Sequence, residues 1–163
     1  SFVLSSGAHS DFYLDCRLVT LHPNGAALVG SIVLDLMQKL HIMVVGGPTM
    51  AADPIVGATV GLSPLTGRPV EGFLVRKAVK DHGTGKLIEG RLPQGKPVLM
   101  VEDVITSAGS VIAAVDAVQA KGNEVKAVFA LVDRQAGGVE ALQARGLEVY
   151  PMFTLEEIRG SAG

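Results

Sequence analysis

Short apolar runs alternate along this chain with longer stretches of helical periodicity, and this alternation constrains the fold more than any other feature. Five runs are rich in β-branched residues and end near glycine, proline or charged residues: 42–47, 70–75, 97–103, 124–133 and 147–153. Strands that are apolar throughout need burial on both faces, as in a parallel sheet covered by helices. The sequence therefore predicts an α/β fold, with a parallel five-stranded Rossmann-like sheet and helices on both faces.

Helical periodicity occupies the intervals between these runs. Residues 24–40, NGAALVGSIVLDLMQKL, place apolar side chains at helical spacing, and we expect Asn24 to cap this helix. Residues 110–122, SVIAAVDAVQAKG, predict a second helix that begins at a serine and runs toward a terminating glycine. Strand and helix thus alternate through most of the chain.

The first residues follow a different pattern. FVLSSGAHSDFYLDCRLV indicates two strands joined by a turn at Ser6–Gly7, so we expect a small antiparallel flap within residues 1–20. The remaining residues, 21–163, form the core, and the whole chain is expected to be one domain. The chain opens at Ser1 without an initiator methionine, and we expect that an N-terminal segment is missing.

Composition argues against several classes of protein. Of 163 residues, 48% are hydrophobic and 18% are charged, which indicates a folded domain rather than a disordered segment. The net charge is −2, so we expect no nucleic-acid partner, which would need a basic surface. No apolar run reaches membrane-spanning length, and we expect no membrane segment. The single cysteine, Cys16, is typical of a reducing compartment, which predicts a cytoplasmic location.

The segment 98–110, VLMVEDVITSAGS, carries the clearest chemical signal. An apolar strand runs into paired acids, Glu102 and Asp103, and then into a turn of small residues that opens a helix. Backbone N–H groups of such a turn can bind a phosphate at the positive end of the helix. Three hydroxyls can add donors: Thr106, Ser107 and Ser110. The acids can hold sugar hydroxyls or, through water, a cation such as Mg²⁺. A capped helix beside two exposed acids is the alternative interpretation.

This order of strand, acids, apolar pair and hydroxyl-rich turn resembles the signature with which type I phosphoribosyltransferases bind phosphoribosyl pyrophosphate (PRPP). By this resemblance, Glu102 and Asp103 hold the ribose hydroxyls, and the turn binds the 5′-phosphate. The turn comprises Thr106, Ser107, Ala108, Gly109 and Ser110. The implied cofactor is Mg²⁺, which PRPP mainly holds and which reaches Glu102 or Asp103 through water. Ala108 is a departure, because relatives often have glycine there.

The segment RKAVKDHGTGK, residues 76–86, concentrates positive charge between glycines. It is similar to the catalytic loop of orotate phosphoribosyltransferases, and the resemblance implies that it closes over the pyrophosphate of PRPP. Its implied contacts are Arg76, Lys77, Lys80, Asp81 and His82. Lys80 and His82, together with Asp103, are the implied catalytic residues, since cations stabilise charge that develops on a leaving group. A solvated surface loop is the alternative.

The resemblance covers nearly the whole chain. The flap resembles a hood over the orotate site, where backbone groups near Phe12 and Tyr13 would line the base pocket. The sequence LVDRQ, residues 131–135, places Arg134 where an arginine of relatives meets orotate, and a guanidinium matches a planar carboxylate. A surface ion pair between Asp133 and Arg134 is the alternative.

GGPTMAADP, residues 46–54, resembles the pyrophosphate loop that follows the first core strand. We interpret Asp53 there as a helix-end residue rather than a catalyst. Two positions depart from well-known bacterial relatives, which have lysine where this chain has Ser5 and Ala51. These departures put the detailed contacts to PRPP in question more than the reaction.

The implied reaction transfers the phosphoribosyl group of PRPP to orotate, giving orotidine 5′-monophosphate and pyrophosphate in pyrimidine nucleotide synthesis. The resemblance also implies a homodimer with active sites shared across the interface. A purine phosphoribosyltransferase is one alternative, but it would lack the R-K-x-x-K-D-H-G loop. A PRPP-binding regulator of the same fold is another, and such a protein should have lost that loop.

Overall fold

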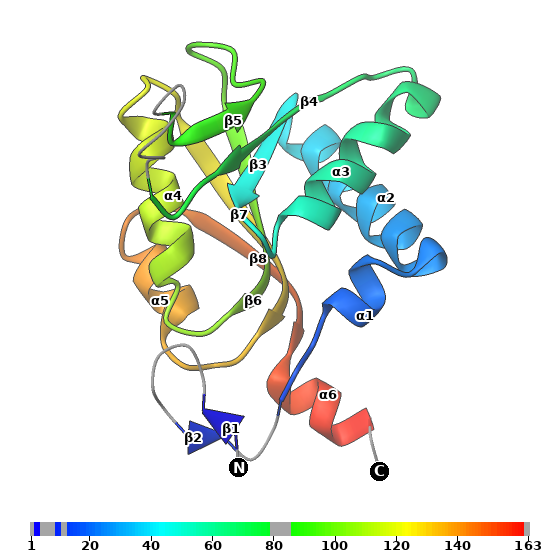
Figure 1. Cartoon of the computed structure of the whole chain (residues 1–163), viewed down its shortest axis with the longest axis vertical. Coiled ribbons are helices and arrows are strands. Elements are labelled where there is room, and N and C mark those ends of the chain that lie inside the picture. Colours follow the sequence, from blue (N-terminus) through cyan, green and yellow to red (C-terminus); the bar gives the residue numbers. More distant parts are fainter. Residues whose placement is uncertain (1, 4–8, 11–12, 79–85, 162–163) are drawn as a thin grey trace.

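A computed structural model of the chain describes residues 2–3, 9–10, 13–78 and 86–161 (Figure 1). The elements in this part of the chain are, in order, β1 (Phe2–Val3), β2 (His9–Ser10), α1 (Arg17–Thr20), α2 (Pro23–Leu40), β3 (Val44–Pro48), α3 (Asp53–Leu62), the 3-10 helix η1 (Ser63–Thr66), β4 (Glu71–Val75), β5 (Ile88–Gly90), β6 (Val98–Ile105), α4 (Gly109–Gln119), β7 (Val125–Asp133), α5 (Gly138–Gln143), β8 (Glu148–Thr154) and α6 (Leu155–Ser161). No helix in these described ranges is long and apolar enough to cross a membrane.

The main sheet has six strands in the order β5-β4-β3-β6-β7-β8. The five predicted strands are present and pair in parallel, and β5 adds an antiparallel edge strand beside β4. The prediction of five strands was therefore one strand short, although the fold class is confirmed. β5 escaped detection because an edge strand needs only partial burial. Its sequence, Ile-Glu-Gly, is short and largely exposed.

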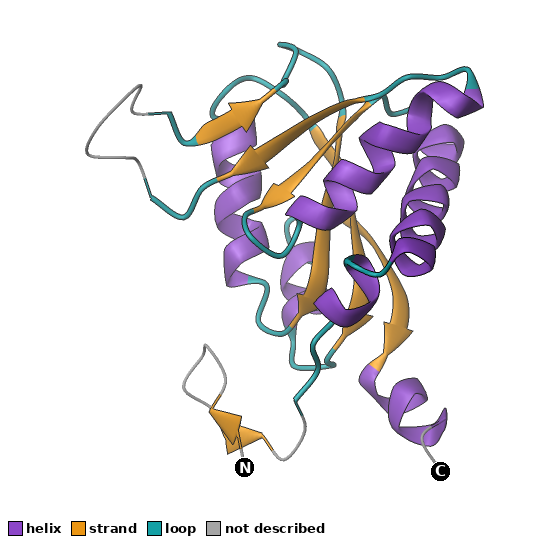
Figure 2. Ribbon diagram, turned by 45° about the vertical axis from the view of Figure 1, so that its right-hand side comes forward, coloured by secondary structure: helices purple, strands orange, loops and turns teal. Residues whose placement is uncertain are grey.

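Helices cover both faces of this sheet, with α2 and α3 on one face and α4 and α5 on the other (Figures 1 and 2). The central strand β6 shows how the faces divide. Val98 and Met100 belong to the apolar cluster that includes α4, whereas Leu99 and Val101 belong to the cluster that includes α2 and α3. All four side chains are fully buried. Burial on both faces explains why the strand is apolar throughout.

The helix α2 corrects one prediction about its cap. His22 is the N-cap residue and Pro23 is the first helical residue, so Asn24 lies inside the helix and does not cap it. Proline suits this position because its fixed φ is helical and its missing N–H is not needed there. The helix ends at His41, which has a left-handed φ of 56°.

The N-terminal flap matches the prediction only in part. β1 and β2 form an antiparallel pair, as expected. The second strand was predicted to continue further, but residues 17–20 form α1 instead. The carboxylate of Asp15 accepts a hydrogen bond from the backbone N–H of Arg17 at 3.1 Å. A short acidic side chain that binds the backbone in this way favours the start of a helix over an extended strand.

Gly47 of β3 lies very close to two neighbouring elements. A Cβ atom at this position would overlap the carbonyl oxygen of Val101 and the methyl group of Ala52. Ala52 is fully buried at the start of α3, and Val101 is fully buried in β6. Since neither group can move away easily, glycine lets the end of β3 lie against both elements.

We predict that Gly47→Ala lowers the free energy of unfolding by about 1–3 kcal/mol, because the added methyl overpacks a rigid site. Urea unfolding monitored by circular dichroism measures this change. Gly61→Ala is the matched control, because Gly61 lies in α3 and a Cβ there would meet no atom within 4 Å. The control should be neutral or stabilising by up to about 1 kcal/mol. Equal unfolding midpoints for the two variants would contradict the proposed close approach.

Candidate active site

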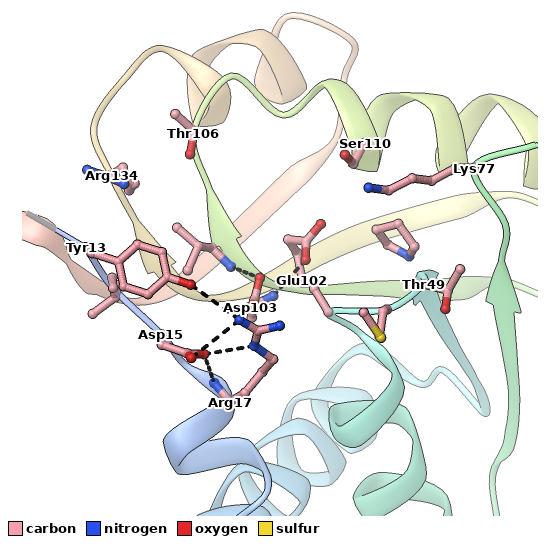
Figure 3. Close-up of a pocket in the computed structure, with 15 residues that line it drawn as sticks. Tyr13, Asp15, Arg17, Thr49, Lys77, Glu102, Asp103, Thr106, Ser110 and Arg134 are labelled. Atoms are coloured by element: carbon pink, nitrogen blue, oxygen red, sulfur yellow. Dashed lines mark hydrogen bonds and ion pairs between the residues drawn. The ribbon is translucent and has the colours of Figure 1, made fainter. Parts of the chain in front are cut away.

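The carboxyl ends of the parallel strands surround a cavity of about 410 Å³ (Figure 3). Open α/β sheets bind ligands at this edge, because the loops that follow parallel strands converge there. Its walls come from the segment before α1, the loop 48–51 after β3, Lys77 after β4, the end of β6 with the start of α4, and Arg134 after β7. Residues distant in sequence thus share one cavity.

A pair of acids lies at the end of β6. Glu102 is only 6% exposed, while Asp103 is half-buried. Glu102 Oε1 accepts a hydrogen bond from the Asp103 N–H at 3.0 Å, and Asp103 Oδ1 accepts one from the Val104 N–H at 2.6 Å. The carboxylates are therefore oriented by the backbone, and both line the cavity.

The environment of Glu102 disfavours its ionised form. Burial raises the pKa of this carboxyl to about 8, and the nearby negative charge of Asp103 contributes to the rise. The charge of Lys77 acts in the opposite direction. Glu102 is therefore harder to ionise than an exposed glutamate.

The turn between β6 and α4 has the form of an anion site. Thr106 and Ser110 line the cavity, and Ser107 and Gly109 are exposed. No side chain caps α4, and its first turn carries no acid. The N–H groups at this helix end are therefore not capped by a side chain and can bind an anion.

Ala108 adopts a left-handed conformation in this turn, with a φ of 63°. Glycine adopts this conformation at lower cost, which explains why relatives can have glycine there. The side chain of Ala108 is 5% exposed and belongs to the apolar cluster that includes α4. Its methyl group therefore contributes to the core.

The loop after β3 is held in place by two hydrogen bonds that Thr49 donates. The Thr49 N–H donates to the Val75 carbonyl at 2.9 Å, and Thr49 Oγ1 donates to Asp53 Oδ2 at 3.0 Å. Asp53 is the first residue of α3, as interpreted from the sequence, whereas Thr49 and Ala51 line the cavity. The Thr49–Met50 peptide bond is cis.

Several predicted residues meet at the cavity, and others do not. Lys77, Arg134 and Tyr13 line it. Arg76 is outside the set of lining residues, and its Nη1 lies 4.0 Å from Glu89 Oε1 of β5. Four predicted residues lie outside the described residues: Phe12, Lys80, Asp81 and His82. No group of three or more His, Cys, Asp or Glu side chains that could hold a metal occurs in the described part of the chain.

Two charged residues of the cavity were missed by the sequence reading. Asp15 and Arg17 both line it, and Arg17 Nε lies 2.9 Å from Asp15 Oδ1. Both residues fall in the segment that was interpreted as flap strands, and no role was predicted for either. The start of α1 at Arg17 instead turns the pair into the cavity (Figure 3). An acid followed at this spacing by arginine, just before a helix, is the signal that could have found them.

Known proteins resemble this chain in sequence. No family model matches it. The orotate phosphoribosyltransferase of Rhodopirellula baltica is 48% identical over 143 residues, which cover 84% of this chain and 74% of that protein. The orotate phosphoribosyltransferase of Streptomyces avermitilis is 45% identical over 134 residues, which cover 82% of this chain and 74% of that protein.

Solved structures resemble it as well. The crystal structure of Mycobacterium tuberculosis orotate phosphoribosyltransferase in complex with PRPP matches with a TM-score of 0.78 and 40% identity, covering 88% of this chain and 81% of that one. The orotate phosphoribosyltransferase of Aeropyrum pernix matches with a TM-score of 0.79 and 26% identity, covering 99% of this chain and 89% of that one. Sequence identity of this size over most of both chains, on the same fold, shows that this chain belongs to the orotate phosphoribosyltransferases, a family of transferase enzymes with the type I phosphoribosyltransferase fold.

Proposed function

We propose that the cavity transfers the phosphoribosyl group of PRPP to orotate, which yields orotidine 5′-monophosphate and pyrophosphate for pyrimidine synthesis. The observation that carries this proposal is the convergence on one cavity of an anion-binding turn, two oriented carboxylates and a cation after β7. Each of these groups suits a different part of the two substrates. The identity of 48% to an orotate phosphoribosyltransferase favours orotate over a purine base, and an enzyme over a regulator.

We propose one orientation for PRPP in the cavity. We assign its 5′-phosphate to the turn 106–110, where N–H groups and hydroxyls can donate at the positive end of α4. The ribose hydroxyls then face Glu102 and Asp103. In the reaction the C1′–O bond to pyrophosphate breaks, the orotate nitrogen bonds to C1′, and positive charge develops on the ribose. Carboxylates beside the ribose favour that charge, so no nucleophilic side chain is required.

The donor set fits Mg²⁺ as a companion of PRPP. Two carboxylates lie side by side, and the pKa of Glu102 is raised to about 8, partly by the charge of Asp103. A cation near the pair would relieve this repulsion. We propose that PRPP oxygens hold most of the Mg²⁺ coordination shell and that water connects the ion to Glu102 or Asp103. Bound there, Mg²⁺ would supply positive charge to the pyrophosphate oxygens.

The remaining roles concern orotate and the leaving group. We assign the orotate carboxylate to Arg134 and the base to the wall formed by Phe12 and Tyr13. Lys77 lines the cavity and is assigned to pyrophosphate. By family resemblance, we assign four further residues of the same loop to pyrophosphate: Arg76, Lys80, Asp81 and His82. Among them, Lys80 and His82 neutralise the charge that builds on pyrophosphate.

We also propose how the chain works as a whole. Residues 1–163 act as one phosphoribosyltransferase domain, in which the hood at 1–20 covers the core at 21–163. The location is cytoplasmic, where a free buried thiol such as that of Cys16 is stable.

A comparison of bases tests the function and the role of Arg134 together. With PRPP and Mg²⁺, we expect pyrophosphate release with orotate and little with uracil, adenine, hypoxanthine or xanthine. Uracil is the informative base, because it is orotate without the carboxylate. Arg134→Ala should lower kcat/KM for orotate by the equivalent of about 1.5–3 kcal/mol, the scale of a charged hydrogen bond, and leave the uracil rate unchanged.

The affinity for PRPP alone is the control in this comparison and should not change in Arg134→Ala. Equal losses for orotate and uracil would reject the carboxylate assignment. Turnover of a purine base in place of orotate would reject the proposed function.

The pKa of Glu102 predicts how stability depends on pH in the ligand-free protein. The pKa of this carboxyl is near 4.5 in the unfolded chain and near 8 in the folded protein. Between these values the folded state binds more protons than the unfolded state, so the unfolding free energy falls as pH rises. The stabilising contribution is complete below the lower pKa and lost above the higher one. Glu102→Gln cannot ionise, and it should be more stable than wild type at about pH 9, by roughly 1–3 kcal/mol.

Urea unfolding at about pH 6 and about pH 9 measures this dependence. Glu124→Gln is the control, because Glu124 is an exposed glutamate at the other end of the sheet, next to β7. It should follow the wild-type curve. If wild type and Glu102→Gln lost the same amount of stability between these two pH values, Glu102 would be ionised across the whole range and the predicted rise in its pKa would be wrong.

A second copy of the chain completes the proposal. We propose a homodimer in which the loop 76–86 of each subunit covers the partner's cavity. A groove between α3 and the edge of the sheet, whose lining includes Val56, Val60 and Leu74, offers apolar surface for such an interface.

Mixing of two inactive variants tests the shared site. Lys80→Ala and Asp103→Ala should each be nearly inactive. After subunit exchange about half of the dimers are mixed, and one of their two sites combines an intact Asp103 with an intact Lys80 from the other subunit. Activity should therefore return to about a quarter of wild type. No recovery, despite exchange proven with differently tagged subunits, would reject the shared site and leave the transferase assignment standing.

A further inference from the structure

Arg17 is a cavity residue to which the roles above assign nothing. Three cationic side chains of the described residues line the cavity: Arg17, Lys77 and Arg134. Lys77 and Arg134 have proposed partners in pyrophosphate and orotate. Arg17 lies before the core of the fold in sequence, yet the start of α1 brings it to the same cavity.

The guanidinium of Arg17 is held along one edge. Its Nε donates to Asp15 Oδ1 at 2.9 Å, and its Nη2 contacts Asp15 Oδ2 and the Tyr13 hydroxyl, both at 3.4 Å. Its Nη1 donates no hydrogen bond to any described residue. A guanidinium held on one edge presents its remaining N–H groups in a fixed direction, which suits a bidentate anion such as a phosphate.

A contribution to folding stability does not by itself account for the ion pair between Arg17 and Asp15. The side chains of Arg17 and Asp15 are 46% and 26% exposed. Arg17 holds the pKa of the Asp15 carboxyl below its usual range, so both groups are charged at neutral pH. Exposed ion pairs contribute little to folding, because water screens their attraction. The arrangement therefore orients Arg17 more than it stabilises α1.

The position of Arg17 indicates which part of PRPP it can reach. In Figure 3, Arg17 lies across Glu102 and Asp103 from Thr106 and Ser110. If the 5′-phosphate occupies the turn and the ribose lies on the acids, the diphosphate extends away from the turn. Arg17 and the loop 48–51 line the same cavity, so the diphosphate can extend toward them. The four residues of this loop that line the cavity carry no charge, and Ala51 stands where some bacterial relatives have lysine.

We propose that Arg17 binds the diphosphate of PRPP and supplies the positive charge that Ala51 lacks, while Asp15 acts as its positioning residue. This inference rests on the function proposed above and adds a residue to it. The orotate carboxylate is the competing partner for Arg17. Measuring the binding of PRPP in the absence of orotate distinguishes these two partners.

Binding of PRPP, measured by calorimetry with Mg²⁺ and without orotate, tests the proposal. Arg17→Ala should raise the Kd of PRPP about tenfold or more, the scale of a lost charge-assisted contact. Asp15→Asn should raise it less, because the guanidinium remains but loses its orientation. Arg145→Ala is the matched control, since Arg145 is also exposed and ion-paired, with Asp116 of α4, and does not line the cavity. Its Kd should equal that of wild type.

A double variant tests whether Arg17 acts through its charge or through a structural role. Ala51→Lys added to Arg17→Ala should restore most of the PRPP affinity, because it returns a cation to the opposite wall of the same cavity. A structural role for Arg17 would not be rescued in this way. Thermal unfolding of each variant shows whether it is folded, and Arg17→Gln replaces Arg17→Ala if the shorter side chain prevents folding.

Three results would overturn the proposal: an unchanged Kd for PRPP in folded Arg17→Ala, a loss confined to the KM of orotate, or no rescue by lysine at position 51. Wild-type turnover of orotate separates this inference from the proposed function. If wild type binds PRPP through Arg17 but does not use orotate, the proposed function fails and the PRPP contact stands.

Discussion

The strand β6 lies between β3 and β7, and its side chains are buried alternately in the two apolar clusters of the molecule. Because neither face can shift without opening a cluster, the carboxyl end of this strand is held in one place. Glu102 and Asp103 lie at that end, and the anion-binding turn follows directly. The same pairing brings the loop after β3 and Arg134 after β7 to the cavity. Packing of the sheet therefore positions the site.

The site places charge where the fold does not favour it. Glu102 is buried beside a second acid, and both causes raise its pKa. A ligand with hydroxyl groups, or a cation, would offset the cost of placing these acids together. The same compromise is seen at Ala108, whose left-handed backbone keeps the turn open to an anion while its methyl fills the core. Both features reduce stability in favour of binding, as expected where a fold carries a site.

Positive charge reaches the cavity from three separate parts of the chain. Lys77 follows β4, Arg134 follows β7, and Arg17 begins α1. Substrates with several negative charges need cations on more than one side, and the sheet alone supplies them on one edge only. The residues just before α1 line another part of the cavity, where Asp15 orients Arg17. In this chain the segment before the core therefore contributes charge to the cavity in addition to its apolar contacts.

The amino-acid sequence by itself determined the strands of the core, the turn after β6 and the identity of the family, because apolar runs and the acid–hydroxyl motif are local patterns. Three local features were not predicted correctly. The edge strand β5 is only partly buried, and a proline at the first helical position shifted the cap of α2. One side-chain hydrogen bond of Asp15 favoured the helix α1 over a strand. Only the tertiary structure decided that Arg17 enters the cavity and that Arg76 lies beside Glu89 instead. A charged side chain carries no periodic signal of its direction, and its position depends on the backbone of other elements packed around it.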